Sequence, residues 1–346
     1  MKILRIVCTA ALLCAVSGIG FAQSMELTGA GATFPLPLYT KLFDVYAKEM
    51  GVKVNYQGIG SGGGIQQLSA QTVDFGGTDA FMDDTQLSKA PGAILHIPIV
   101  AGAVVLTYNL PSNPELSFNS DIIAGIFLGD ITMWNDAKIA AANPKASLPN
   151  LAIAVVRRSD GSGTTFTFTD YLTKISTTWK EKVGRGSAIN WPTGVGAKGN
   201  PGVAGLVKQL PGSVGYVELI YALQNNMSYG SVINKKGAAV KPTLASTATA
   251  ADVALPDDMR VMITDTDAAS GYPIAGFTWV IVYKEQGYGN RTAEKAQAVV
   301  KMLWWMTHEG QKYAEELQYA KLSPAAIAKA ETLLRSMTFK AAALLK

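Results

Sequence analysis

The sequence has few residues that bind metals or act as covalent nucleophiles. Its only cysteines are Cys8 and Cys14, and its only histidines are His96 and His308. Transition-metal sites need several such ligands at short spacing, and neither histidine has a second ligand two or four positions away. We therefore expect no metal site and no cofactor. His96 is predicted to be a satisfied core or edge residue, and His308 an exposed residue of a C-terminal helix.

The pattern of a serine hydrolase is also missing. That chemistry places its serine in a Gly-x-Ser-x-Gly turn between a strand and a helix, with a histidine later in the chain. The stretch Asp160-Gly161-Ser162-Gly163 resembles such a turn only superficially. We therefore expect a protein that is not an enzyme.

Charged residues are scarce, at 16% of the chain against about 25% in ordinary globular domains. The net charge is +4, and no stretch contains five or six like charges in a row. Nucleic-acid-binding surfaces need clustered cations, so no nucleic-acid partner is expected. With 346 residues and 48% hydrophobic composition, the chain can form two ordinary domains with cores of their own.

The first residues have the organisation of a secretory signal. Lys2 and Arg5 precede an apolar stretch at 6–16, and small residues at 18–22 follow it. This order predicts cleavage after residue 22 and export of the mature chain. The apolar stretch is shorter than the roughly 20 residues that span a bilayer.

Both cysteines fall inside this signal, so the exported chain is expected to have no thiol and no disulfide. A lipid anchor on Cys14 is the alternative. It is disfavoured because Leu13 is bulkier than the small residue that usually precedes a lipidated cysteine.

Beyond the signal, the hydrophobic pattern alternates between the periods of strands and helices. Strands are expected at 53–57, 74–76, 94–108, 152–157, 214–217 and 277–283. Helices are expected at 38–49, 65–72, 81–87, 119–128, 137–142, 167–175, 201–209, 292–318 and 324–336. This alternation is typical of α/β architecture with largely parallel sheets. Residues 238–256, rich in Ala, Thr and Pro, are expected to form an exposed excursion.

Three loops rich in glycine, serine and threonine each lead into a predicted helix. They are residues 28–35, 58–64 and 157–165, and the second and third also follow a predicted strand. Small residues let backbone N–H groups approach a ligand, and a helix N-terminus attracts negative charge. One such loop is often only a tight connection. Three together predict one oxyanion site assembled from two domains.

The second loop also permits another interpretation. Gly58, Gly60 and Gly63 match Gly-x-Gly-x-x-Gly after a strand, and Asp79 follows roughly 20 residues later, where a ribose-binding acid would stand. The predicted export signal argues against a nicotinamide enzyme, because such cofactors are scarce outside the cytoplasm.

Charged residues accompany these loops. Arg157 and Arg158 end a predicted strand, and only one of them can face the site because side chains alternate along a strand. Asp160 can hold that guanidinium by a charge-assisted pair. Asp79 is either the N-cap of the next helix or an acceptor for a protonated oxyanion, which would admit phosphate and reject fully ionised sulfate.

Together these motifs resemble the family of periplasmic phosphate-binding proteins of bacterial Pst-type ABC transporters. The resemblance lies in residues 29–35 (GAGATFP), 54–61 (VNYQGIGS), 73–79 (VDFGGTD) and 154–164 (AVVRRSDGSGT), and continues through 191–192, 198–200 and 212–218 to the C-terminal helices. It covers nearly the whole mature chain. Gly62 and Ser159 depart from the family pattern, and residues 243–267 match it poorly.

The resemblance implies an α/β fold of two lobes joined by a hinge, the type II periplasmic binding protein fold, each lobe a mainly parallel sheet flanked by helices. It implies that residues 25–105 and 276–346 form one lobe and residues 106–275 the other. Inorganic phosphate would be buried between the lobes, and a transmembrane ABC permease would read their closure in the periplasm. It also implies a monomer.

The resemblance further implies a set of phosphate contacts. Thr33, Phe34 and Ser61 would donate hydrogen bonds, Phe34 through its backbone N–H. Asp79 would accept the phosphate proton, Arg158 would be the single cation, steadied by Asp160, and Ser162, Gly163 and Thr164 would complete the site. Two other functions stay open at this point: an exported enzyme acting on phosphate esters, and a surface interaction protein whose loops bind no ligand.

Overall fold

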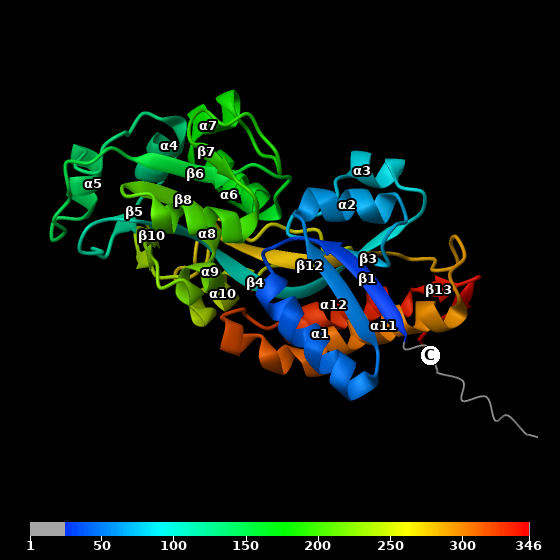
Figure 1. Ribbon diagram of the computed structural model, residues 1–346. Coiled ribbons are helices and arrows are strands. Elements are labelled where there is room, and N and C mark those ends of the chain that lie inside the picture. Colours follow the sequence, from blue (N-terminus) through cyan, green and yellow to red (C-terminus); the bar gives the residue numbers. More distant parts are fainter. Residues whose placement is uncertain (1–24, 346) are drawn as a thin grey trace, which may run out of the picture.

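The computed structural model describes residues 25–345. Figure 1 shows two α/β bodies side by side, joined through strands that pass between them. We call the body that contains the N-terminal strands the first lobe, and the other body the second lobe. A path of eight paired strands runs through both lobes, with a ninth paired off it. This architecture confirms the predicted α/β fold of two lobes.

The sheet of the first lobe begins with three parallel strands at its edge. Their order is β2 (Lys53–Gly58), β1 (Glu26–Gly31) and β3 (Phe75–Thr78). Next comes β12 (Ala275–Tyr283), which is antiparallel to β3 and to β4 (Ile94–Tyr108).

The sheet of the second lobe continues from the other half of β4. Its strands are β8 (Ser213–Glu218) and β9 (Ser228–Tyr229), both antiparallel to β4, then β6 (Ala154–Arg158) and β7 (Val195–Ala197). β6 is parallel to both β7 and β8. In each lobe, the strands farthest from β4 are therefore parallel to one another.

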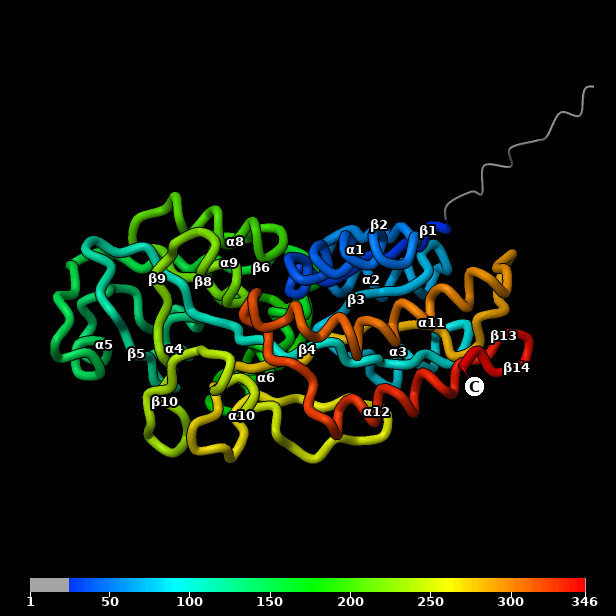
Figure 2. The backbone as a smooth tube through the Cα atoms, turned by 90° about the horizontal axis from the view of Figure 1, so that it is seen from below, coloured from blue at the N-terminus to red at the C-terminus, as the bar shows by residue number. Residues whose placement is uncertain are grey.

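The strand β4 belongs to both lobes. Its residues Ile94 to Ala103 pair with β12, whereas Val104 to Tyr108 pair with β8. All of its residues except Leu95 are buried, as expected for a strand covered on both faces. Figure 2 shows this strand running through the middle of the molecule from one lobe to the other.

Helices cover the sheet of the first lobe. In Figure 1, α2 and α3 lie above the strands, and α1, α11 and α12 lie below them. The bounds are α1 (Leu36–Met50), α2 (Ser61–Ser69), α3 (Asp84–Lys89), α11 (Ala293–Thr307) and α12 (Pro324–Arg335), with 3-10 turns η1 (Glu309–Tyr313) and η2 (Glu315–Leu317). The short hairpin β13 (Thr338–Phe339) and β14 (Ala342–Ala343) follows α12.

The second lobe has its own helices and a small sheet. Its helices are α4 (Ser120–Leu128), α5 (Ala137–Ala142), α6 (Gly163–Ile175), α7 (Thr177–Lys182), α8 (Gly199–Gln209), α9 (Leu219–Gln224) and α10 (Leu244–Ala251). The small sheet contains β11 (Ala239–Val240), β10 (Ser231–Ile233) and β5 (Ser117–Phe118).

The helix predicted at 292–318 is shorter than expected. It ends at Thr307, because the backbone of His308 leaves the helical conformation (φ −120°, ψ −95°), and the His308 ring lies 2.8 Å from the Trp304 carbonyl (Nδ1 to O). The ring also stacks on Trp304 and contacts Glu331. The prediction of an exposed His308 is therefore wrong. His96 is buried and its Nε2 accepts from the backbone N of Met82 at 3.0 Å, which confirms a satisfied core histidine.

The expectation of an exposed excursion at 238–256 is also wrong for its central part. α10 forms there and buries Ser246, Thr247 and Ala250. Small side chains on one face let this helix lie close to β4 and β12.

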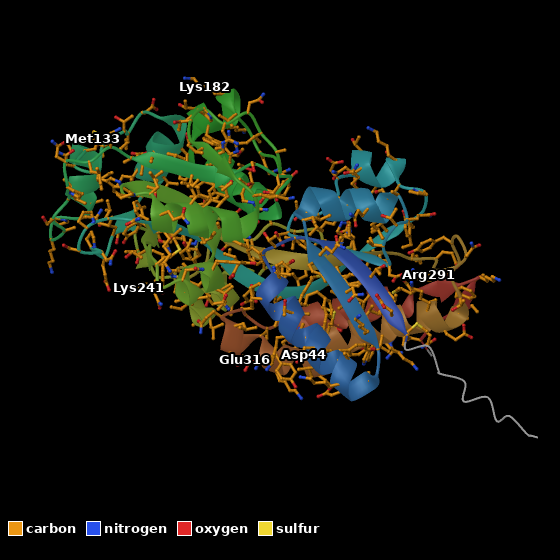
Figure 3. The ribbon with its side chains drawn as sticks, in the orientation of Figure 1. Asp44, Met133, Lys182, Lys241, Arg291 and Glu316 are labelled. Atoms are coloured by element: carbon orange, nitrogen blue, oxygen red, sulfur yellow. The ribbon has the colours of Figure 1, made fainter. Side chains whose placement is uncertain are left out.

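Charges of both signs lie around the surface of the two lobes. Figure 3 labels Asp44, Lys182, Lys241 and Glu316 near the outer edges. Many of these charged side chains form ion pairs with a neighbour on the surface, as Lys241 Nζ does with Glu115 Oε2 at 3.2 Å. In the described part of the chain, no helix is long and apolar enough to cross a bilayer.

Candidate functional site

Loops from both lobes meet where β4 passes between them. From the first lobe come the turn between β1 and α1, the turn between β2 and α2, and the end of β3. From the second lobe comes the turn between β6 and α6. These are the carboxyl ends of parallel strands, where α/β sheets bind ligands. All of the predicted site residues are brought together here: Thr33, Phe34, Ser61, Asp79, Arg158, Asp160, Ser162, Gly163 and Thr164.

The lobes touch at this site through backbone groups. Gly62 N donates to Gly161 O at 2.9 Å, and Gly163 N donates to Ser61 Oγ at 3.0 Å. A Cβ on Gly163 would lie 2.5 Å from both Asp79 Oδ2 and Ser61 Oγ, which is far inside van der Waals contact. The structure is therefore closed, and glycine at 163 is what allows the lobes to come this close.

Two buried hydroxyls of the first lobe each accept at least one hydrogen bond from the second lobe, and Ser61 also accepts one from its own lobe. Ser61 Oγ accepts from the backbone N of Asp79 at 3.2 Å and of Gly163 at 3.0 Å. Thr33 Oγ1 accepts from the backbone N and from Nδ2 of Asn200, both at 3.0 Å. A hydroxyl has one proton and two lone pairs, so an oxygen that already accepts twice has only its proton left to offer.

The hydroxyl of Thr164 is arranged in the same way. Its Oγ1 accepts from Arg158 Nη1 at 3.3 Å and from Asn200 Nδ2 at 3.0 Å. Ser162 is the N-cap of α6, and its Oγ accepts from Thr165 N at 3.0 Å. The result is a group of buried hydroxyls oriented to donate protons, which is what an anion requires.

Arg158 is the cation of this site. Its Nε donates to Asp160 Oδ1 at 2.7 Å, and its Nη2 forms a second short bond to Asp160 Oδ2. Burial disfavours the ionised form of Asp160, but the bonds and charge of Arg158 outweigh it and lower the pKa of the carboxyl. Arg157 points toward Gly196 instead, and its Nη1 donates to the Arg158 carbonyl at 3.3 Å. The structure thus decides which arginine faces the site.

Asp79 is a buried carboxyl on the first-lobe side. Its Oδ1 accepts from Thr278 Oγ1 at 2.9 Å. Burial raises the pKa of Asp79 from 3.8 to about 7, and the hydrogen bonds from Thr278 and Ser61 and the charge of Arg158 limit the rise. Among the groups gathered here, Asp79 is therefore the acceptor whose protonation changes near neutral pH.

Asp79 does not cap a helix. The helix predicted at 81–87 begins later, and its N-cap is Asp83, whose Oδ1 accepts from Gln86 N at 2.7 Å. The N-cap interpretation of Asp79 is therefore wrong. The turn that matches Gly-x-Gly-x-x-Gly packs against the second lobe, where a Cβ on Gly60 would lie 2.7 Å from Gly161 O. Gly60 therefore allows contact between the lobes, which argues against a dinucleotide site.

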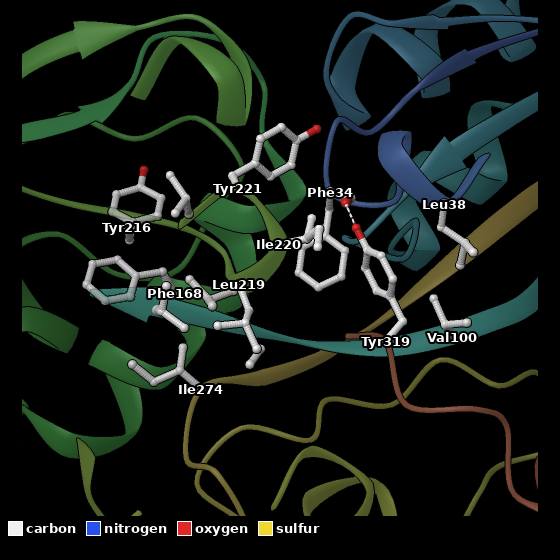
Figure 4. Close-up of a cluster of buried hydrophobic side chains, with 14 of the residues drawn as sticks. Phe34, Leu38, Val100, Phe168, Tyr216, Leu219, Ile220, Tyr221, Ile274 and Tyr319 are labelled. Carbon is white, nitrogen blue, oxygen red and sulfur yellow. Dashed lines mark hydrogen bonds between the residues drawn. The ribbon is translucent and has the colours of Figure 1, made fainter. Parts of the chain in front are cut away.

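The sequence interpretation missed several buried polar residues of the site. Asn200 contacts Thr33 and Thr164, and Thr278 contacts Asp79. Tyr221 OH donates to the Thr33 carbonyl, and Tyr319 OH donates to the Phe34 carbonyl at 2.6 Å, the bond drawn in Figure 4. Each comes from an element distant in sequence. Asn200 lies in the stretch 198–200 that carries the family resemblance, but its contacts, like those of the others, are visible only in the tertiary structure.

Metal-ligating side chains do not gather in the part of the chain that the structure describes. Within residues 25–345, no three His, Cys, Asp or Glu side chains are placed to hold one metal ion. The polar groups described above are hydrogen-bond donors, the Arg158–Asp160 pair and the carboxyl of Asp79.

A family model described as a PBP superfamily domain matches residues 20–303 of the chain. Among curated relatives, the phosphate-binding protein PstS of Xylella fastidiosa is 43% identical over 307 residues, covering 87% of this chain and 83% of that protein. The phosphate-binding protein PstS of Pasteurella multocida is 42% identical and covers 89% of each chain.

Solved structures have the same fold. A high-affinity periplasmic phosphate-binding protein bound with phosphate superposes with a TM-score of 0.72 at 22% identity, covering 89% of this chain and 93% of that chain. The phosphate-binding protein of Stenotrophomonas maltophilia gives a TM-score of 0.70 at 21% identity, with the same coverage.

Proposed function

The chain belongs to the PBP superfamily and, within it, to the family of PstS phosphate-binding proteins, and we propose that it captures inorganic phosphate between its lobes and delivers it to a membrane ABC permease. We assign the contacts to Thr33, Phe34, Ser61, Asp79, Arg158, Ser162, Gly163 and Thr164, with Asp160 holding Arg158.

The observation that carries this proposal is the balance of donors and acceptors. The hydroxyls of Thr33 and Thr164 are oriented to donate, and the hydroxyl of Ser61 hydrogen-bonds to Asp79, whose carboxyl is buried. A ligand that satisfies both must be an anion that still carries a proton. Phosphate carries at least one proton near neutral pH and sulfate carries none, so the site matches phosphate.

We propose that the two lobes comprise residues 25–105 with 276–346, and residues 106–275, and that they move about β4 and the start of β12. Support comes from β4, which changes partner between Ala103 and Val104. Within the second range, Met259 and Arg260 pack on the first lobe: Trp279 Nε1 donates to Met259 O and Arg260 Nη1 to Met82 O, both at 3.0 Å. This segment of the second range therefore makes non-covalent contacts with the first lobe, in addition to the strands that pass between the lobes.

We propose that the protein works in the periplasm as a monomer. The predicted signal at 1–22, its cleavage site and both cysteines lie outside the described residues. Support for the location comes from the family, since one structural neighbour is named a periplasmic phosphate-binding protein. A transmembrane permease is the partner that such a carrier requires.

We propose that the chain has no enzymatic activity. Hydrolysis of a phosphate ester needs a nucleophile with a base or a metal-bound water. His96 is buried with its Nε2 bound to Met82 N, and burial lowers the pKa of His96 to about 3. His308 lies beside Trp304 and Glu331, away from the site. Release of nitrophenolate from p-nitrophenyl phosphate by the purified protein would contradict this view.

The proposed function is tested by isothermal titration of the mature protein, freed of ligand by unfolding and refolding. We expect tight one-to-one binding of phosphate and no response to sulfate at about pH 8, where Asp79 is ionised. Equal responses to both anions would contradict the role of Asp79. No response to either would favour a surface protein that binds no ligand.

The contribution of the cation can be measured with Arg158→Ala. Arg158 is already paired with Asp160, so we expect phosphate affinity to fall by about 10- to 100-fold, less than a bare buried cation would contribute. Arg157→Ala is the matched control, because that side chain points away from the site, and its affinity should stay close to wild type. An equal loss of phosphate affinity in both variants would contradict the assignment of Arg158 as a phosphate contact.

A further inference from the structure

Asn200 is a completely buried amide whose polar atoms all have partners. It lies in the first turn of α8, directly after Gly199, which has φ of +70°. Its backbone N and Nδ2 donate to Thr33 Oγ1, Nδ2 also donates to Thr164 Oγ1, and Oδ1 accepts from Glu218 N at 2.9 Å. This one side chain therefore contacts a hydroxyl of each lobe.

The orientation of the amide is fixed by its surroundings. The backbone N–H of Glu218 can only donate, so the atom of Asn200 that faces it must be the oxygen. The two protons of Nδ2 then point at Thr33 Oγ1 and Thr164 Oγ1. Turning the amide over would place two donors against each other at Glu218.

We infer that Asn200 is a positioning residue that makes the hydroxyls of Thr33 and Thr164 donors toward the bound anion. Without its amide, each hydroxyl could turn its proton to a protein acceptor and present a lone pair to the anion. This inference rests on the proposed function, because it concerns the same phosphate site. It adds to the proposed phosphate contacts a residue that does not contact the ligand itself but hydrogen-bonds two residues that do.

This arrangement forms only when the lobes are closed. Thr33 belongs to the first lobe, whereas Asn200 and Thr164 belong to the second. The same closure lets Tyr221 OH donate to the Thr33 carbonyl. The turn between β1 and α1 is thus bound by the second lobe both at the Thr33 side chain and at the Thr33 backbone. Asn200 therefore couples closure to the orientation of the donors.

The test compares phosphate affinity in wild type, Asn200→Ala, Thr33→Val and the double variant. We expect Asn200→Ala to weaken binding by about 10- to 100-fold. If Asn200 acts through Thr33, its loss costs several-fold less in the Thr33→Val background, because there is no hydroxyl left to orient. A purely structural role would multiply the two losses, and that result would overturn the inference.

Asn109→Ala is the matched control. Asn109 anchors the other end of α8, with Nδ2 donating to the carbonyls of Val207 at 3.1 Å and Lys208 at 3.0 Å. It should leave phosphate affinity unchanged, even if the melting temperature falls. An equal loss of affinity in Asn109→Ala would assign the effect to helix placement and overturn the inference. Failure of wild type to bind phosphate would instead reject the proposed function.

Discussion

Gly163→Ala should abolish tight phosphate binding while leaving the fold intact. The atoms that a Cβ would meet, on Asp79 and Ser61, all belong to the other lobe. Gly163 is the first residue of α6 and has no positive φ, so alanine fits the helix itself. The open form therefore accepts the methyl group and the closed form does not. We expect affinity to fall by at least about 100-fold in isothermal titration.

The control for this variant is Gly205→Ala in α8. Gly205 has open space where its Cβ would be, and alanine in a helix is favoured over glycine by about 0.5–1 kcal/mol. We expect Gly205→Ala to bind phosphate as wild type does and to melt slightly higher. Thermal unfolding without phosphate should show Gly163→Ala folded. Wild-type affinity in Gly163→Ala would mean that the lobes do not meet there in the bound state.

Asp79→Asn should remove the discrimination between phosphate and sulfate. An ionised Asp79 and a sulfate oxygen are both acceptors, so sulfate leaves two buried acceptors facing each other. An amide at this position can donate to sulfate instead. We expect sulfate affinity to rise by at least about 100-fold in competition titrations. Asp44→Asn, an exposed carboxyl paired with Lys48, should change nothing.

The same carboxyl predicts a pH dependence. Burial raises the pKa of Asp79 to about 7, so the group is ionised above that pH and protonated below it. A protonated carboxyl can donate, so sulfate should begin to compete as the pH falls from about 8 to about 6, and should be excluded again as it rises. In Asp79→Asn, sulfate binding should not vary over this range. Sulfate that stays silent in Asp79→Asn at every pH would contradict the acceptor role.

Local patterns in the sequence predicted much of the fold. The strand at 94–108 agrees with β4 to the residue, because an unbroken apolar run is typical of a strand buried on both faces. The helix predicted at 119–128 forms with Asn119 as its N-cap, whose Oδ1 accepts from Ile122 N at 2.9 Å. The C-terminal helix ended early because the backbone of His308 leaves the helical conformation where its ring packs on Trp304 and contacts Glu331, and no periodicity shows such contacts.

The sequence predicted those contacts of the candidate site that join residues close together in the chain. Arg158 and Asp160 are two residues apart, so their pairing could be expected from the sequence. Strand alternation alone left the choice between Arg157 and Arg158 open, because it depends on which face of β6 meets the first lobe; the family resemblance implied Arg158. Asn200 lies in the stretch 198–200 that carries the family resemblance, but its role could not be expected, since it acts on Thr33, 167 residues away in the chain.

The sequence by itself determined the elements of this protein and their chemistry. Hydrophobic periods set the strands and helices, and glycine- and hydroxyl-rich turns set which helix N-termini can approach an anion. Only the tertiary structure decided how those turns face each other: Gly163 against Asp79, and Asn200 between Thr33 and Thr164. The physical reason is that a hydroxyl donates in the direction that its neighbours leave open, and these neighbours are brought together by closure of the two lobes.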